Sequence, residues 1–181
     1  HADKARDAVP PAPPAFWSAL AGEYIGTFVL VFFGVGSVNA AVATGAQAGL
    51  WQVAVVWAIG VSLGIYASAA LSGAHINPAI TLGFLLTNKI PVRHAMWAWG
   101  AQIAGGIFGA AVIFGIASGR DGWERGNFAS NGWDRDGFSS LGAAIIVEIV
   151  FTALFVVAVL EFVGDAAFAQ LLRQHGRRNV S

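Results

Sequence analysis

Residues 72–81 read SGAHINPAIT and lie inside a long apolar stretch. Asn is a strongly preferred N-cap and Pro at the first helical position has its φ already set, so Asn77 and Pro78 predict a helix start. This helix would begin within the membrane, where its free N–H groups and positive dipole end need partners. Lipid supplies none, so the preceding backbone must line a water-filled path or be buried in protein. The alternative is an interfacial hairpin in which Asn77 only caps the helix and His75 is a core side chain.

The sequence around this motif contains no Asp, Glu, Lys or Arg from residue 24 to residue 88. One bilayer crossing needs about 20 apolar residues, so at least two crossings are expected here. We predict them over residues 16–43 and 50–71. The segment Asn77–Asn88 is too short to cross, because at about 1.5 Å per residue it covers about half of a roughly 30 Å hydrocarbon core. It is predicted to be re-entrant or interfacial.

Two further crossings are predicted in the second half of the chain, over residues 95–118 and 141–163. A polar loop at residues 119–140 separates them. The expected fold is therefore an all-α membrane protein with four transmembrane helices and one re-entrant half-helix.

Three segments are expected along the chain. Residues 1–15 are polar and Pro-rich, which predicts a disordered leader that stays attached, because the apolar stretch after it is too long for a signal peptide. Residues 16–163 form the transmembrane domain. Residues 164–181 form a polar tail, with a short amphipathic helix at residues 166–175.

The composition excludes several classes of protein. Only 11% of residues are charged, the mean hydropathy is +0.65, and the net charge is zero, so no basic surface is available for nucleic acid. There is no cysteine, which excludes thiol chemistry and Cys-based metal sites. The histidines and carboxylates have no metal-ligand spacing and no nucleophile beside a base, so we expect no enzyme and no cofactor.

The basic residues predict the orientation, since they are enriched on the cytoplasmic side. In a four-crossing arrangement seven fall on one side (Lys4, Arg6, Lys89, Arg93, Arg173, Arg177, Arg178) and three on the other (Arg120, Arg125, Arg135). Both termini are therefore expected in the cytoplasm. Trp17, Trp97 and Trp99 would then lie near the inner interface and Trp51 near the outer one.

Two carboxylates lie within predicted crossings, and their contexts match. Glu23 is followed by Thr27 and an apolar run, and Glu148 is followed by Thr152 and a similar run, which indicates an internal repeat. A carboxylate in hydrocarbon implies a buried partner or a polar path. We favour carboxylates that accept hydrogen bonds from irregular loop backbone; the alternative is a proton relay. The pairs Gly60/Gly64 and Gly105/Gly109 indicate close helix packing.

Four strings carry a resemblance to a known family. They are AGEYIGTF at residues 21–28, SGAHINPA at 72–79, AQIAGG at 101–106 and EIVFTAL at 148–154. They resemble, in turn, the first-helix signature, the first Asn-Pro-Ala loop, the third-helix motif and the fourth-helix start of the aquaporin and glycerol-facilitator family, the major intrinsic proteins. The resemblance runs from about residue 17 to residue 162, and SGxHxNPA is its most specific part.

The resemblance implies an aquaporin-like bundle of six crossings and two half-helices that forms a passive pore for water or small neutral solutes such as glycerol, usually in a tetramer. It implies that Asn77, within Asn77-Pro78-Ala79, donates its amide N–H to the permeant. The carbonyls of Gly73, Ala74 and His75 would accept hydrogen bonds from the permeant on the cytoplasmic side. It further implies that Glu23 braces loop backbone, with Glu148 in the equivalent place. Proton exclusion by half-helix dipoles is a property of such pores.

Selectivity between water and glycerol is only partly readable. Trp57 lies twenty residues before Asn77, in a string that resembles the glycerol-conducting branch, where a Trp forms the apolar wall of the outer constriction. An indole face would favour a carbon backbone. The string NFASNGW at residues 127–133 is more similar to bacterial water channels. We lean to a glycerol-type or mixed pore, and the alternative for Trp57 is a plain core aromatic.

The repeat predicts a second Asn-Pro-Ala near residue 202, while the sequence ends at 181. We therefore expect a truncated member of the family, a frameshifted product or a fragment. Besides a channel, two functions stay open. One is a non-conducting membrane subunit that associates with complete relatives, and the other is a secondary transporter that uses Glu23 and Glu148 as proton carriers.

Overall fold

The structure, a computed structural model, describes residues 15–45, 49–130, 132–133 and 139–176, and within these every regular element is a helix. In chain order they are α1 (Phe16–Thr44), α2 (Leu50–Ser72), α3 (Pro78–Leu86), α4 (Val92–Ala117), the short 3₁₀ helix η2 (Trp123–Ala129) and α5 (Leu141–Gly176).

Four of these helices are long and apolar enough to cross a membrane: α1, α2, α4 and the segment Leu141–Phe162 of α5. Their bounds agree with the predicted crossings to within one helical turn. The prediction of an all-α membrane protein with four crossings is confirmed. Between the second and third crossings lies α3, which at nine residues is about 13 Å long and cannot cross.

The last helix is longer than predicted. We expected a crossing that ends near residue 163 and a separate short helix at residues 166–175, but α5 runs without a break to Gly176. The junction contains no Pro, and the sequence DAAFAQLL that follows Gly164 is rich in good helix formers. A single Gly is tolerated in a helix at a cost of about 1 kcal/mol, so the helix continues through it.

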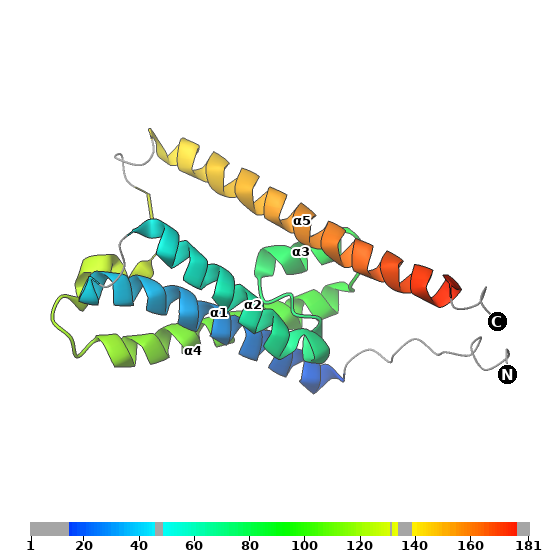
Figure 1. The fold of residues 1–181 in the computed structure, drawn as a ribbon, viewed down its shortest axis with the longest axis horizontal. Coiled ribbons are helices and arrows are strands. Elements are labelled where there is room, and N and C mark those ends of the chain that lie inside the picture. The colour runs from blue at the N-terminus through cyan, green and yellow to red at the C-terminus, as the bar shows by residue number, and fades with distance from the viewer. Residues whose placement is uncertain (1–14, 46–48, 131, 134–138, 177–181) are drawn as a thin grey trace.

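The bundle is built around α1, which packs against α2 on one side and α4 on the other (Figure 1). Glycines allow the backbones to approach closely. A Cβ at Gly105 would lie 2.3 Å from the Tyr24 carbonyl oxygen, and one at Gly64 would lie 2.7 Å from the Gly26 carbonyl oxygen. Both belong to the Gly-x-x-x-Gly pairs that predicted close helix packing, and that prediction is confirmed.

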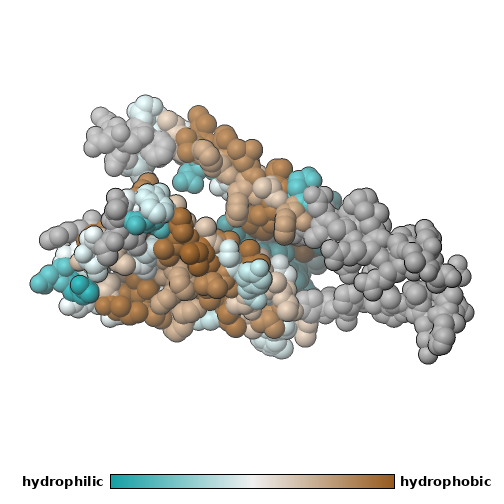
Figure 2. All heavy atoms as spheres, in the orientation of Figure 1, coloured by the Kyte–Doolittle hydropathy of each residue, from teal (hydrophilic) through white to brown (hydrophobic). Residues whose placement is uncertain are grey.

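The position of α5 differs from that of the other long helices. It packs against α3, and only 6% of its most apolar spanning window is buried within the described chain. Figure 2 shows apolar side chains along α5 and along the outer faces of the other helices. In Figure 1 the first turn of α1 and the last turn of α5 lie at the same end of the bundle.

The loop after α4 folds over the end of that helix. Phe114 of α4 makes edge-to-face contacts with Trp123 and Phe128 of η2, at ring-centroid distances of 5.4 and 5.8 Å. Helix η2 also contacts α1. This aromatic cluster lies at the opposite end of α4 from the loop that leads into it from α3.

Candidate functional site

The half-helix α3 begins as its sequence predicts. Asn77 is its N-cap, with extended backbone, and its Oδ1 accepts a hydrogen bond of 2.8 Å from the Ala79 N–H. Pro78 is the first helical residue. Because the Asn77 carbonyl also accepts from the Thr81 N–H at 3.0 Å, both main-chain and side-chain acceptors of Asn77 hold the first turn.

The loop before α3 turns through backbone conformations that non-glycine residues seldom adopt. Gly73 has φ 87°, and Ala74 and Ile76 have φ 54° and 44°. The left-handed region costs a residue with a side chain about 1–2 kcal/mol, so other contacts must stabilise the turn. The first of these is local, since the Ser72 hydroxyl accepts from the Ala74 N–H at 3.0 Å.

Glu23 of α1 supplies the remaining backbone contacts. Its Oε1 accepts from the His75 N–H at 3.0 Å and its Oε2 from the Ile76 N–H at 2.8 Å. The side chain is 1% exposed. On the same face of α1, the Thr27 hydroxyl donates to the Ile76 carbonyl at 3.3 Å. Two residues one helical turn apart therefore fix the loop from its buried side.

A second set of contacts joins Glu23 to α3 through α4. The Gln102 amide Nε2 donates to Glu23 Oε2 at 2.6 Å and to Thr81 Oγ1 at 2.9 Å. Thr81 Oγ1 in turn donates to the Asn77 carbonyl at 3.2 Å and lies 3.3 Å from His75 Nδ1. Gln102 and Thr81 are almost completely buried, so this network is shielded from solvent.

Sequence reasoning did not assign Gln102 or Thr81 to the site. Gln102 appeared only as part of a family string, yet a polar amide in the middle of an apolar crossing is itself a signal for a buried partner. Its Oε1 has no hydrogen-bond partner among the described residues. Nothing in the local sequence around Thr81 indicates that it contacts a residue 21 positions away.

Several polar groups of the loop are not used by these contacts. Among the hydrogen bonds of the described residues, none involves Asn77 Nδ2 or the carbonyl oxygens of Gly73, Ala74 and His75. The Gly73 residue is exposed and Asn77 and Ala74 are half-buried. One amide donor and three carbonyl acceptors, on Asn77 and on residues 73–75, thus have no partner within the described residues, in a loop that Glu23 and Thr27 hold.

The predicted aromatic wall, Trp57, lies on α2 and is half-buried. Its six-membered ring rests against α1, where a Cβ at Gly34 would lie 2.5 Å from three of the ring atoms. The glycine therefore makes room for the indole between the two helices.

Glu148 lies apart from the other site residues. Its side chain is exposed and lines an apolar groove of about 540 Å³ between α3 and α5, together with Thr152, Leu82 and Gly83. No hydrogen bond in the described part of the chain joins it to Glu23 or to the loop. The structure does not bring the two repeat-related carboxylates together.

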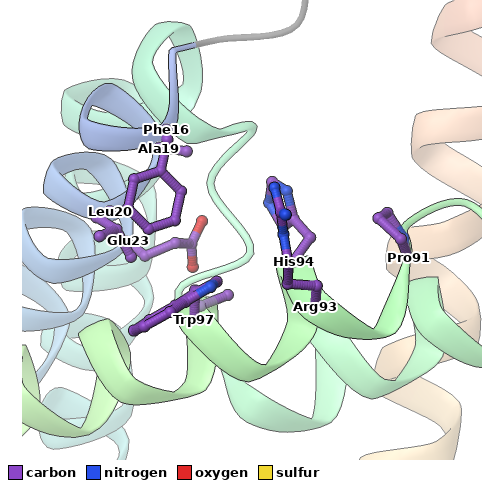
Figure 3. Close-up of a pocket in the computed structure, with 9 residues that line it drawn as sticks. Phe16, Ala19, Leu20, Glu23, Pro91, Arg93, His94 and Trp97 are labelled. Carbon is purple, nitrogen blue, oxygen red and sulfur yellow. The ribbon is translucent and has the colours of Figure 1, made fainter.

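A smaller cavity of about 190 Å³ lies beside Glu23, between the first turns of α1 and α4 (Figure 3). Phe16 and Trp97 form its apolar walls, and their rings are 5.5 Å apart. His94 and Arg93 line the wall formed by α4. The Glu23 carboxylate points towards this space in Figure 3, although its oxygens already accept three hydrogen bonds.

Known proteins resemble this chain over most of its length. The family model described as Major intrinsic protein matches residues 12–170. Aquaporin Z of Brucella melitensis is 38% identical over 144 residues, which are 78% of this chain and 63% of that protein. The glycerol uptake facilitator protein of Pseudomonas aeruginosa is 33% identical over 168 residues, which are 86% of this chain and 60% of that protein.

The fold also matches a solved structure. The X-ray structure of the aquaglyceroporin from Plasmodium falciparum superimposes with a TM-score of 0.56 at 32% identity, covering 58% of this chain and 43% of that one. The chain spans about three fifths of the length of the two curated relatives above.

Proposed function

The chain belongs to the major intrinsic protein family, whose members are transport channels, and we propose that it forms a passive channel for water and small uncharged solutes such as glycerol. The permeant is guided by the Asn77 half-helix. The chain is an integral multi-pass membrane protein.

One observation carries this proposal. The loop before α3 is held from its buried side by Glu23 and Thr27, while Asn77 Nδ2 and the carbonyls of Gly73, Ala74 and His75 have no partner within the described residues. A solute with hydroxyl groups can accept from the amide and donate to the carbonyls. Fixed polar groups of both kinds replace the hydration that a small neutral molecule loses on entering a narrow path.

The test is stopped-flow light scattering on proteoliposomes, with sucrose and then glycerol as the osmolyte. The channel predicts fast shrinkage in sucrose and re-swelling in glycerol. Asn77→Asp keeps an oxygen to cap Ala79 but loses the amide donor, so permeability should fall severalfold. Asn88→Asp, at an exposed position in the loop after α3, is the matched control and should not change it.

Rates equal to those of empty liposomes would instead favour the second candidate, a non-conducting membrane subunit that associates with complete relatives. Co-purification with such a relative would then be the deciding experiment. The sequence similarity to the glycerol uptake facilitator, over 86% of the chain, supports that candidate.

Selectivity is proposed to depend on Trp57. Its indole packs against Gly34 of α1, and an apolar wall formed by this ring would favour the carbon backbone of glycerol. Trp57→Ala should lower the glycerol rate more than the water rate. The ratio of the two rates on the same vesicles cancels any difference in the amount of folded protein.

We further propose that both termini are cytoplasmic and that the channel is a tetramer in the plasma or inner membrane. The support is the seven-to-three bias of basic residues and the family. Because the chain has no cysteine, single variants Ser181→Cys and Ser130→Cys report the two sides. A membrane-impermeant maleimide should label only Ser130→Cys from outside intact cells, and light scattering of the purified protein gives the number of chains.

A further inference from the structure

The indole of Trp99 reaches the half-helix from α4. Its Nε1–H donates to the Pro78 carbonyl oxygen at 3.1 Å, across 21 residues of sequence. Pro78 is the first residue of α3 and directly follows Asn77. The sequence assigns Trp99 only to an interfacial belt, whereas this bond ties its polar atom to the turn that presents Asn77.

We propose that Trp99 is a positioning residue: through this bond it fixes the position of the Asn77 half-helix, α3, relative to α4. The inference rests on the proposed role of Asn77 in the channel. Trp99 lies seven residues into α4, about 11 Å from its first residue, and this bond uses the single N–H donor of its indole.

The bond complements the contacts on the other side of the loop. Glu23 and Thr27 hold the backbone of His75 and Ile76, which precede the half-helix. Trp99 acts on Pro78, just after Asn77. Asn77 is thus fixed by α1 contacts on the residues before it and by an α4 contact on the residue after it, and removing either set leaves one side of the turn unsupported.

The chain provides a matched control two residues away on the same helix. Trp97 is 52% exposed, its ring packs against Phe16, and no hydrogen bond from its Nε1 is found within the described residues. Trp99→Phe and Trp97→Phe remove the same indole N–H and keep an aromatic ring. Only the first removes a bond to α3.

The experiment is hydrogen–deuterium exchange of the 181-residue protein in lipid nanodiscs, read by mass spectrometry on peptides that cover α3. Trp99→Phe should speed exchange in α3 about threefold to tenfold, the range for loss of one interhelical hydrogen bond in a membrane, while α2 peptides stay unchanged. Trp97→Phe should leave α3 unchanged. Equal α3 exchange in both variants and the unaltered protein would overturn the proposal.

Two further measurements keep the result interpretable. If Trp99→Phe does not fold, the indole N–H groups of the unaltered, ¹⁵N-tryptophan-labelled protein decide: the Trp99 proton should exchange at least tenfold more slowly than that of Trp97, and equal rates would refute the bond. Stopped-flow rates on the same variants test function separately. A chain that does not conduct would refute the proposed channel, while the exchange data would still decide the position of α3.

Discussion

Replacing Glu23 with Gln is expected to destabilise the loop that presents Asn77. The two carboxylate oxygens of Glu23 accept from three donors: the His75 and Ile76 N–H groups and the Gln102 amide. A glutamine of the same shape has one oxygen and one NH₂ group. Whichever way it is oriented, its NH₂ group faces at least one backbone donor that then has no acceptor.

The magnitude follows from the two possible orientations. If NH₂ replaces Oε1, the His75 N–H loses its acceptor. If it replaces Oε2, the Ile76 N–H loses its acceptor instead. The Gln102 amide can then flip so that its free Oε1 accepts from the new NH₂ group, but this flip removes the bond from Gln102 Nε2 to Thr81. Leaving one buried donor unpaired costs about 1–3 kcal/mol, and the lost bond to a carboxylate adds to this, so we expect a loss of about 2–4 kcal/mol.

The assay is equilibrium unfolding in mixed micelles of dodecylmaltoside and SDS, followed by circular dichroism. Glu124→Gln is the control, because this carboxylate is exposed in η2, outside the four crossings, and the same change there should stay within about 0.5 kcal/mol. If Glu23→Gln and Glu124→Gln shift the transition equally, the three hydrogen bonds of Glu23 do not stabilise the loop.

Two further changes test the packing and the network. Gly105→Ala should lower the free energy of unfolding by more than about 2 kcal/mol, because the new Cβ would lie 2.3 Å from the Tyr24 carbonyl oxygen. The control is Gly100→Ala, whose Cβ would have no neighbour within 4 Å, so it should be neutral or stabilising. Unfolding in mixed micelles measures both. Thr81→Val removes the hydroxyl that accepts from Gln102 with little change in volume, so a loss of about 1–2 kcal/mol is expected, and a neutral result in the same assay would mean that this bond contributes nothing.

Local features of the site were readable from the sequence because a few neighbouring residues determine them. The charge-free run predicted the first two crossings, and Asn77-Pro78 predicted the start of α3 to the residue. The end of α5 was not readable in the same way. Gly164 resembles a stop signal, but helix propensity on both sides outweighs it.

Contacts between helices were harder to predict. Gln102 donates to both Glu23 and Thr81, and it reaches Glu23 because Gly105 lets α4 approach α1 closely. The sequence showed the small residues but not which polar groups they bring together. The same holds for Trp99, whose position in the sequence suits a membrane interface as well as a bond to Pro78.

The two repeat-related glutamates show where the support of the half-helix resides. Glu23 is buried and bonded, whereas Glu148, in the same sequence context, lies exposed in the groove between α3 and α5. A shared sequence context therefore does not produce a shared environment; the environment of Glu23 comes from the loop before α3 and from Gln102.

Every hydrogen bond described for that loop and the first turn of α3 comes from residues between Glu23 and Gln102. Among the described side chains, no hydrogen bond joins α5 to α3, and the two helices meet at the groove, for example at Val156 against Gly83. Changes in α5 should therefore alter the groove while leaving the geometry of Asn77 unchanged.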